Sequence, residues 1–435
     1  YLVDGTVKVA DPYATLVLDP FNDAEINNAY FPEYPDKANG LVTAWKNGGY
    51  DFNWTDQNFE KPEKEELVIY ELLLRDFLPD HSYTTLADTL DYLKNLGVNA
   101  IELMPVQEFE GNNSWGYNPS FHMALDKYYG DPIDFKNFVN AAHEAGIAVI
   151  LDVVYNHVFS QSPLAQLYWD ATNFRPTADN PWLNVNARHP FNVGYDVNHE
   201  STYSRDWVKQ VSAYWLEEFH VDGFRFDLSK GFTQTNNPND VGAWGNYDAS
   251  RIAIWKEYAD AIRTVDSETL MILEHFAANT EERELADYGF MLWGNSNHNF
   301  SEASMGWLSE SNFSGAFYSN RGWDQPLLVS YMESHDEERL MYNNLNFGNS
   351  DGDYSVRDFS TAIERQEMVN VFYWLIPGPR MIWQFGELGY DFSINYCEGG
   401  GVEPSCRLDR KPIRWDYYRD PERKGLYDHI AALTD

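Results

Sequence analysis

The sequence is poor in cysteine, in basic residues and in long apolar runs. Its 435 residues include 31 Lys or Arg against 68 Asp or Glu, which gives a formal net charge of −37. Because binding to phosphates depends on Lys and Arg, this balance argues against a nucleic-acid partner or an anionic membrane surface. No run of about 18 apolar residues occurs, so the sequence predicts no membrane insertion.

The only two cysteines, Cys397 and Cys406, lie nine positions apart in a loop rich in glycine and proline. The favoured interpretation is a disulfide that closes a small ring, and the alternative is a pair of free thiols. Two cysteines alone make a poor metal site. The chain begins at Tyr1 without a basic leader and ends at Asp435 within an expected helix, which indicates a mature or truncated fragment that lacks flanking domains.

Aromatic residues are abundant, with 15 Trp, 29 Tyr and 26 Phe. Such rings either pack in a core or stack on sugars, and composition alone does not decide between these two uses. The hydrophobic content of 43% and the charged content of 23% are those of a globular protein, so the sequence argues against disorder.

From Leu67 onward, short β-rich runs alternate with helical patterns, as in a parallel sheet with crossover helices. The expected strands are residues 68–77, 100–106, 148–154, 223–228, 271–274, 289–292, 329–332 and 380–384. The expected helices between them include 85–96, 134–145, 203–219, 250–264 and 361–375. Eight strands are the number in an α/β TIM (β/α)8 barrel. A doubly wound sheet is disfavoured, since no Gly-rich phosphate loop follows the first strand.

Two segments do not fit this alternation. Residues 1–62 carry Asp-Pro turns and several glycines, which predicts the tail of an N-terminal β module followed by a linker. Residues 63–435 form the expected catalytic barrel. Within it, residues 158–202 are too long for an ordinary connection and predict a small B subdomain inserted after the third strand.

Polar residues cluster where the expected strands end, which is where TIM barrels carry their reacting groups. Asp227, Glu274 and Asp336 place three carboxylates at that rim. Arg225 lies two residues before Asp227 and therefore points to the same side of its strand. We expect the guanidinium to keep Asp227 ionised, while an apolar setting raises the pKa of Glu274 so that it holds a proton. One nucleophile and one acid are the pair used by a retaining glycosidase, with carboxyl groups about 5 to 5.5 Å apart.

Four segments, residues 152–157, 223–230, 273–275 and 333–336, resemble the four signature regions of the α-amylase family of glycoside hydrolases, family 13. They occur in the order and on the strands that this family uses, and the resemblance spans roughly residues 67–420. It implies that Asp227 is the nucleophile, Glu274 the general acid/base and Asp336 the group that stabilises the transition state. The N-terminal stretch also resembles the module that precedes the barrel in pullulanases, isoamylases and branching enzymes.

The same resemblance implies sugar-binding roles for five further residues. Arg225, His157 and His335 match the residues around the sugar at subsite −1, Tyr117 matches the tyrosine that stacks on it, and Lys230 matches a contact further along the glucan. Two departures are present: Leu273 replaces a common Gly before the acid/base, and Gly231 replaces a common His after the lysine. The second departure weakens the transfer of the Lys230 contact.

Calcium is a further implication of the resemblance. Asp152 and Asn156 match structural positions, and many family members use the equivalent of Asn156 as a calcium ligand. The inserted segment adds Asp170, Asp179 and Asp196, which suit a hard cation that takes six to eight oxygen ligands. An acidic solvated loop without a metal is the alternative.

Several other residues near the rim have open roles. Trp115, Phe191, Trp244 and Trp293 join Tyr117 as candidate platforms for sugar stacking. Three polar residues are at least as well explained as structural hydrogen-bond partners, namely His122, Glu333 and Glu387.

These observations favour an endo-acting α-amylase that hydrolyses α-1,4 bonds in starch, glycogen or maltooligosaccharides, and Lys230 motivates that choice. The alternatives are a pullulanase-type debranching enzyme or a branching enzyme that transfers glycosyl groups, and, more remotely, a non-catalytic glucan-binding relative. The expected partner is an α-glucan, the expected state is a monomer, and no organic cofactor is expected. A possible disulfide and a polymeric substrate suggest an extracellular, periplasmic or cell-surface location.

Overall fold

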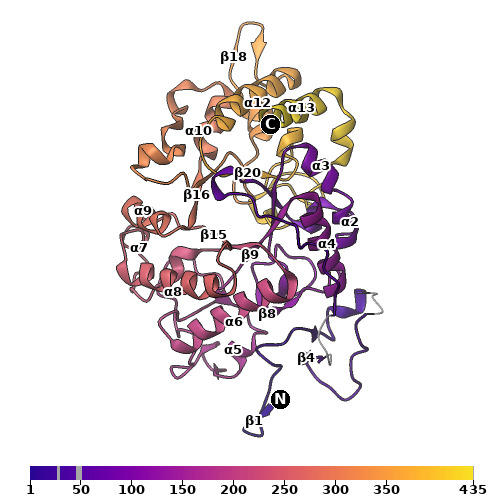
Figure 1. Ribbon diagram of the computed structural model, residues 1–435, viewed down its shortest axis with the longest axis vertical. Coiled ribbons are helices and arrows are strands. Elements are labelled where there is room, and N and C mark those ends of the chain that lie inside the picture. Colours follow the sequence, from indigo (N-terminus) through magenta and orange to yellow (C-terminus); the bar gives the residue numbers. More distant parts are fainter. Residues whose placement is uncertain (27–29, 46–50, 435) are drawn as a thin grey trace.

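A computed structural model describes residues 1–26, 30–45 and 51–434 (Figure 1). Eight parallel strands close into a barrel, and β20 pairs with β5 to complete it. In chain order the strands are β5 (Val68–Leu72), β6 (Ala100–Leu103), β9 (Ala148–Val153), β14 (Gly223–Phe226), β15 (Leu270–Leu273), β16 (Met291–Asn295), β17 (Leu328–Tyr331) and β20 (Arg380–Trp383). The predicted (β/α)8 barrel is therefore confirmed.

Most strands are buried along their whole length, as expected where helices cover a parallel sheet. The first strand is shorter than predicted. It ends at Leu72 and is followed by α1 (Leu74–Phe77), because the Leu73 N–H donates to the side chain of Gln384 (2.8 Å) and leaves the sheet ladder. The sixth strand starts two residues later than predicted, because Gly289 takes a φ of +95° as the chain leaves the preceding helix.

The main covering helices lie where they were expected. They are α4 (Pro132–Ala145), α6 (Thr202–Phe219), α8 (Ala249–Val265) and α12 (Phe359–Trp374). Asp131 begins α4 with a capping box and Gly146 ends it in the left-handed conformation. The single helix predicted at 85–96 is instead two, α2 (Tyr83–Ala87) and α3 (Leu90–Asn95), and the Thr89 hydroxyl between them donates to Leu86 O (2.7 Å).

Other helices complete the layer around the barrel or lie in its loops. They are α5 (Pro163–Gln166), α7 (Val241–Trp244), α9 (Asn279–Asp287), α10 (Asn297–Met305), α11 (Leu340–Phe347) and α13 (Pro421–Thr434). In Figure 1, α12 and α13 pack together near the top, and the hairpin of β18 (Ser350–Asp351) and β19 (Tyr354–Ser355) extends beyond them.

The segment between β9 and α6 folds into short paired strands. The pair β10 (His157–Val158) and β13 (Tyr195–Asp196) closes it, and β11 (Trp169–Asp170) pairs with β12 (Arg175–Pro176) inside it. A second hairpin, β7 (Gln107–Phe109) and β8 (Pro119–Leu125), was not predicted. Its connecting loop carries Tyr117, so this hairpin helps to build the rim.

The N-terminal segment contains two small antiparallel pairs, β1 (Leu2–Val3) with β2 (Val7–Lys8) and β3 (Val17–Leu18) with β4 (Val42–Thr43). It lies at the bottom of Figure 1 and packs on β8 through a small cluster of Ala10, Ala14, Val17, Phe121 and Ala124. Its origin in a separate β module stays a prediction. Among the helices of the described residues, none is both long and apolar enough to cross a membrane.

Candidate active site

Asp227 and Glu274 follow the carboxyl ends of two neighbouring strands, β14 and β15. Phe226 pairs with Leu273, so the next residue of each strand emerges at the same level of the barrel. Only 15% of the Asp227 side chain and 14% of the Glu274 side chain are exposed. Asp227 Oδ1 lies 3.1 Å from Arg225 Nη1, and Glu274 Oε2 lies 3.1 Å from Arg225 Nη2. One guanidinium therefore holds both carboxylates as neighbours.

Arg225 is itself fully buried inside the barrel. Its Nη1 also donates to both carboxylate oxygens of Asp152 (2.8 and 2.9 Å), and its guanidinium lies 4.1 Å from the ring centroid of Trp293. A buried cation is tolerated only where opposite charges and π faces replace water. The sequence prediction that Arg225 faces the same way as Asp227 is confirmed by these contacts.

The protonation of the two carboxyl groups differs from the sequence expectation. Burial raises the pKa of Asp227 well above its usual range, and the neighbouring Glu274 raises it further against the opposing effect of Arg225. Burial likewise raises the pKa of Glu274. Arg225 therefore does not by itself keep Asp227 ionised. The pair titrates as a unit in which one carboxyl group favours holding a proton while the other is ionised.

Asp336 follows β17 and lies in a more open position, with 41% of its side chain exposed. Its Oδ1 accepts a hydrogen bond from Arg407 Nη2 (2.6 Å), and its Oδ2 lies 3.6 Å from His335 Nε2. Burial alone would raise the pKa of Asp336, but His335 and Arg407 outweigh it, so the pKa is lowered. The structure thus presents Asp336 as a carboxylate.

A chain of hydrogen bonds links His335, the residue before Asp336, to Asp152, which in turn binds Arg225. Glu71 Oε1 lies 2.5 Å from His335 Nδ1, and His335 Nε2 lies 3.0 Å from the Tyr117 hydroxyl. That hydroxyl donates to Asp152 Oδ2 (2.5 Å). Burial lowers the pKa of His335, but Asp336 and Glu71 raise it to about 10. His335 is therefore an imidazolium that donates to both neighbours.

The remaining predicted sugar contacts are occupied by the protein itself. His157 Nε2 bonds to Tyr117 O (2.9 Å), and burial lowers the pKa of His157 to about 4, so the ring is neutral. The Tyr117 ring stacks on His335 at 5.2 Å. Lys230 Nζ donates to Phe276 O (2.8 Å). Lys230 therefore contributes to the packing of the rim in this conformation.

Two of the candidate sugar platforms lie beneath cations instead of facing solvent. Trp293 is 1% exposed under Arg225, and Trp244 is 3% exposed with Lys230 Nζ 4.1 Å from its ring centroid. Their indole faces are thus already used. Trp115 is 8% exposed beside His335, whereas Phe191 is 65% exposed. Phe191 is the most open of these rings.

The three residues that were equally well explained as structural do have structural partners. His122 Nε2 bonds to Val154 O (3.0 Å), and Glu333 accepts from Arg339 Nη1 (3.0 Å) and from the Leu340 N–H (2.6 Å). Glu387 accepts from the hydroxyls of Tyr70 and Tyr92 (3.0 and 2.5 Å).

The residues expected to bind calcium have different surroundings. Asn156 is buried, and among the described residues neither the nitrogen nor the oxygen of its side-chain amide has a hydrogen-bond partner. Asp196, however, accepts from the side chain of Asn184 (2.8 Å) and lies 3.2 Å from His189 Nε2. Asp170 and Asp179 are solvent-facing. Within the part of the chain that is described, no group of three His, Cys, Asp or Glu side chains gathers around Asn156, and calcium binding stays a prediction.

A histidine, His189, also lies beside Gly231 and Asn156. His189 Nδ1 lies 2.7 Å from Pro190 O and its Nε2 faces the Asp196 carboxylate. A Cβ atom at Gly231 would lie 2.1 Å from Asn156 Oδ1 and 2.8 Å from His189 Nε2. The absence of a side chain at position 231 therefore allows the amide and the imidazole to approach the backbone there.

Sequence reasoning missed three residues of this site. Glu71 and Glu102 lie on β5 and β6, and Arg407 follows the second cysteine. The Glu102 carboxyl is fully buried and has no hydrogen-bond partner within the described ranges, and burial together with Glu71 raises its pKa well above its usual range. A single acidic residue inside each of two apolar runs was the signal that could have identified Glu71 and Glu102.

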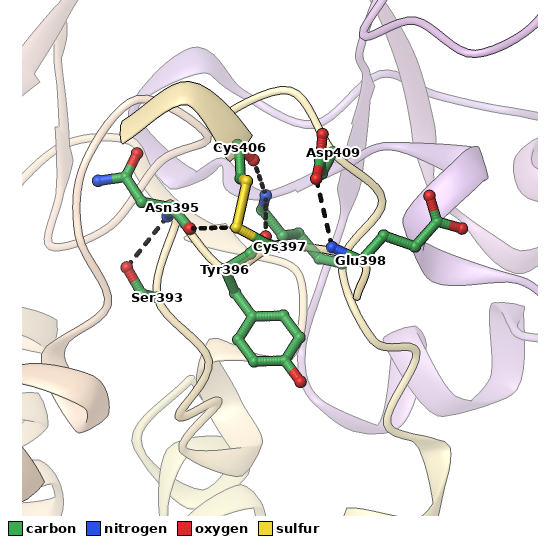
Figure 2. Close-up of a disulfide and its surroundings, with 8 residues drawn as sticks. Ser393, Asn395, Tyr396, Cys397, Glu398, Cys406 and Asp409 are labelled. Atoms are coloured by element: carbon green, nitrogen blue, oxygen red, sulfur yellow. Dashed lines mark hydrogen bonds between the residues drawn. A yellow bond between two sulfur atoms is a disulfide. The ribbon is translucent and has the colours of Figure 1, made fainter. Parts of the chain in front are cut away.

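The predicted disulfide between Cys397 and Cys406 is confirmed (Figure 2). It closes a loop after β20, and Figure 2 shows the backbone N–H of Glu398 held by the Asp409 side chain. Arg407 extends from the next residue to the site.

The fold and the charged rim define a β/α barrel whose reacting groups are carboxylates at the carboxyl ends of the strands. Comparison of the sequence with protein families agrees with this class. The family described as "Alpha amylase, catalytic domain" matches residues 82–167 and 182–429, which is more than half of the chain. The chain therefore belongs to the α-amylase family of glycoside hydrolases.

Curated relatives within the family have several different activities. The chain is 34% identical to a malto-oligosyltrehalose trehalohydrolase of Saccharolobus solfataricus, over 51% of this chain and 36% of that protein. It is 28% identical to a 1,4-alpha-glucan branching enzyme of Picrophilus torridus, over 78% and 44% respectively. It is 31% identical to the chloroplastic isoamylase 3 of Oryza sativa, over 50% and 32%. The chain thus spans less than half the length of these relatives.

Solved structures share the fold across nearly the whole chain. A type I pullulanase from Bacillus subtilis superposes with a TM-score of 0.69 at 21% identity, over 98% of this chain and 61% of that one. A putative alpha amylase from Salmonella typhimurium gives 0.68 at 19% identity, over 99% and 75%. At these identities the similarity shows the fold alone.

Proposed function

We propose that this domain hydrolyses α-1,4 bonds within α-glucans, with retention of configuration, as an endo-acting α-amylase. The observation that carries the proposal is the joint binding of Asp227 and Glu274 by the guanidinium of Arg225. A retaining mechanism needs two neighbouring carboxyl groups, one ionised and one protonated. The separation of about 5 to 5.5 Å between them stays a prediction.

In the first step Asp227 attacks the anomeric carbon while Glu274 protonates the departing glycosidic oxygen. The Leu228 N–H (2.7 Å) and Arg225 both bind Oε2 of Glu274. Among the described residues no hydrogen bond reaches Oε1, so that oxygen is free to carry the proton. In the second step the Glu274 carboxylate removes a proton from water, which attacks the glycosyl–Asp227 ester and releases the sugar with its original configuration.

Asp336 and the imidazolium of His335 complete the site. The transition state has the character of an oxocarbenium ion, which a nearby carboxylate stabilises electrostatically. The chain from Glu71 through His335 to Tyr117 fixes the orientation of the ring that faces the sugar. These side chains therefore act on charge and position, and the covalent chemistry belongs to Asp227.

The direct test is a pair of conservative variants assayed on a soluble maltooligosaccharide. Asp227→Asn is expected to lose at least about 1,000-fold in kcat, because the nucleophile is removed, while glucan binding is retained. Glu274→Gln is expected to lose the ability to protonate a sugar leaving group, and to recover activity on an aryl glycoside whose leaving group needs no proton. Near wild-type turnover by either variant on maltooligosaccharides would overturn the assignment.

A second candidate is cleavage or transfer at α-1,6 branches. The relatives named a branching enzyme and an isoamylase favour it, and Lys230 does not oppose it, because that side chain binds the protein in this structure. Parallel digestion of amylose, pullulan and glycogen separates the candidates. Pullulan cut at α-1,6 bonds with amylose spared would replace the first proposal, and longer or more branched products would indicate transfer.

We also propose a location outside the cytoplasm, extracellular, periplasmic or at the cell surface. The disulfide supports this, because such bonds persist in oxidising compartments. Fractionation of cells that produce the full-length protein, followed by thiol labelling, tests it. The monomeric state likewise stays a prediction, which light scattering would check.

A further inference from the structure

The loop closed by the disulfide is held rigidly at its second cysteine (Figure 2). The Cys397 N–H donates to Gly401 O (3.0 Å), and the Cys406 N–H donates to Glu403 O (2.9 Å). The covalent bond and these hydrogen bonds together restrict the chain immediately before Arg407.

The backbone on both sides of Arg407 is also anchored from outside the loop. Lys411 Nζ donates to Cys406 O (2.8 Å), which is the carbonyl before Arg407. Arg75 Nη1 donates to Leu408 O (3.1 Å), the carbonyl of the residue that follows Arg407. Arg75 is buried and paired with Asp76, so this anchor belongs to the barrel core near β5. Residue 407 is therefore mounted on a fixed backbone.

The Arg407 side chain makes two hydrogen bonds to Asp336. Its Nη2 donates to Asp336 Oδ1 (2.6 Å) and to Asp336 O (3.0 Å). The guanidinium also lies 5.6 Å from the ring centroid of Trp115, whose edge faces His335. Two contacts from one nitrogen to the side chain and the backbone of the same residue define the orientation of that carboxylate.

This pair is poorly suited to a purely structural role. The Arg407 side chain is 39% exposed and that of Asp336 is 41% exposed. Ion pairs this open contribute little to stability, because water screens them. The Arg407–Asp336 ion pair therefore matters more for the position of the Asp336 carboxylate than for the stability of the protein.

We propose that Arg407 is a positioning residue for Asp336, and that the disulfide-closed loop is the mount that delivers it. The inference rests on the proposed glycosidase function, in which Asp336 stabilises the transition state. It assigns to the loop after β20 a part in catalysis that the residues of the barrel strands do not supply.

Other charged groups around Asp336 also affect its pKa. The groups that interact with it electrostatically are the cations His335 and Arg225 and the carboxyl groups of Asp227, Glu274 and Glu337. Removing Arg407 takes away one of the three cations that lower the pKa of Asp336, so Asp336 becomes easier to protonate. The acid limb of the activity profile is then expected to move to higher pH.

The first test compares Arg407→Met with Arg410→Met. Arg410 lies in the same segment and binds the Tyr128 hydroxyl (2.8 Å), so it is a matched control without a contact to Asp336. For Arg407→Met we expect kcat to fall about 100-fold with a smaller change in KM, as for a misplaced reacting group. Arg407→Lys is expected to restore part of kcat and the acid limb, whereas Arg410→Met stays within about twofold of wild type. Wild-type kcat and an unshifted acid limb in Arg407→Met would overturn the proposal.

The second test asks whether the disulfide acts through Arg407. The double variant Cys397→Ser/Cys406→Ser is expected to lower kcat about tenfold in the wild-type background and to have almost no further effect in the Arg407→Met background. Equal fold-losses in both backgrounds would show that the disulfide and Arg407 act independently, which would overturn the role of the loop as a mount.

A readout that needs no activity keeps this inference separate from the proposed function. Asp336 is partly exposed, so a carbodiimide with glycine ethyl ester labels it when its carboxyl group is protonated and accessible. At mildly acidic pH, mass spectrometry is expected to show labelling of Asp336 several-fold faster in Arg407→Met than in wild type or Arg410→Met. If wild type cleaves no α-glucan but this difference is present, the proposed function fails and the positioning of Asp336 by Arg407 stands. Equal labelling in all three proteins would overturn the inference.

Discussion

The two halves of the catalytic rim hold their carboxylates in different ways. Asp227 and Glu274 lie at the ends of neighbouring strands, are about 15% exposed, and share a cation from inside the barrel. Asp336 is 41% exposed and is held by a cation from a loop outside the strands. Under the proposed mechanism, the covalent chemistry belongs to the buried strand ends, where burial perturbs protonation, and the electrostatic stabilisation belongs to a more open carboxylate that a cross-linked loop holds.

The largest expected effect comes from a change at Arg225, which holds the inner pair of carboxyl groups, Asp227 and Glu274. Arg225→Met removes the cation shared by Asp152, Asp227 and Glu274, so we expect at least about 1,000-fold loss of kcat. Because buried acidic partners are left uncompensated, the free energy of unfolding should fall by about 3 to 5 kcal/mol, measured by denaturant titration. The control is Arg407→Met, whose stability should stay within about 1 kcal/mol of wild type. Equal stability losses in both variants would remove the distinction between inner and outer cations.

A smaller effect on kcat is expected for Glu71→Gln. This variant tests the hydrogen-bonded chain through His335 that connects Asp336 with the inner carboxyl groups. The carboxylate of Glu71 helps to raise the pKa of His335 to about 10, so its loss lets the imidazolium deprotonate at lower pH. We expect kcat to fall about tenfold and the alkaline limb of the pH profile to move to lower pH. Assays across pH 5 to 10 would measure both. An unchanged alkaline limb would show that His335 does not need its charge.

The charge of His335 should also make the free energy of unfolding of the protein depend on pH. Its pKa in the folded state, about 10, lies above the ordinary value of 6.5 for an unfolded chain. The stability that its charge contributes is therefore fully present below about pH 6.5 and is lost as the pH rises through about 10. Unfolding measured at several pH values should show this decline in wild type and a weaker one in Glu71→Gln. A decline of equal steepness in both would assign it to other groups.

The smallest expected effect concerns metal removal at the junction of the barrel and the inserted segment. Since the Asp196 carboxylate already binds the Asn184 side chain and lies beside His189, a chelator should change Tm by less than about 1 °C, and added calcium should not raise it. A drop of several degrees that calcium reverses would show that the junction between the barrel and the inserted segment rearranges to bind the ion. His189→Gln serves as the comparison, because it removes an imidazole ring that lies beside Gly231 together with Asn156.

Much of the fold followed from local patterns. The eight strands were expected because apolar runs of β-forming residues alternate with amphipathic helices, and the boundaries differ mainly at β5 and β16. The misplaced end of β5 depends on a hydrogen bond from Leu73 to Gln384, which lies 311 positions away. A contact of that range has no local signal, so single-sequence reasoning places such ends poorly.

The candidate site was predicted only as residue types at strand ends. Asp227, Arg225 and Glu274 could be placed together because strand periodicity and strand order constrain them. The direction of the Asp227 pKa was wrong, since the sequence shows the adjacent arginine but shows neither the burial nor Glu274. The platforms Trp244 and Trp293 were likewise misjudged, because whether a ring meets solvent or a cation depends on packing.

By itself the sequence determined the barrel, the three carboxylates of its rim, the acidic surface and the pairing available to its only two cysteines. These depend on local propensity, periodicity and counting. Only the tertiary structure decided that Glu71 helps to raise the pKa of His335, that burial raises the pKa of Glu102, and that Arg407 binds Asp336. The reason is physical: a charge is set by everything within a few ångströms of it, and in this barrel those neighbours come from strands and loops hundreds of residues apart.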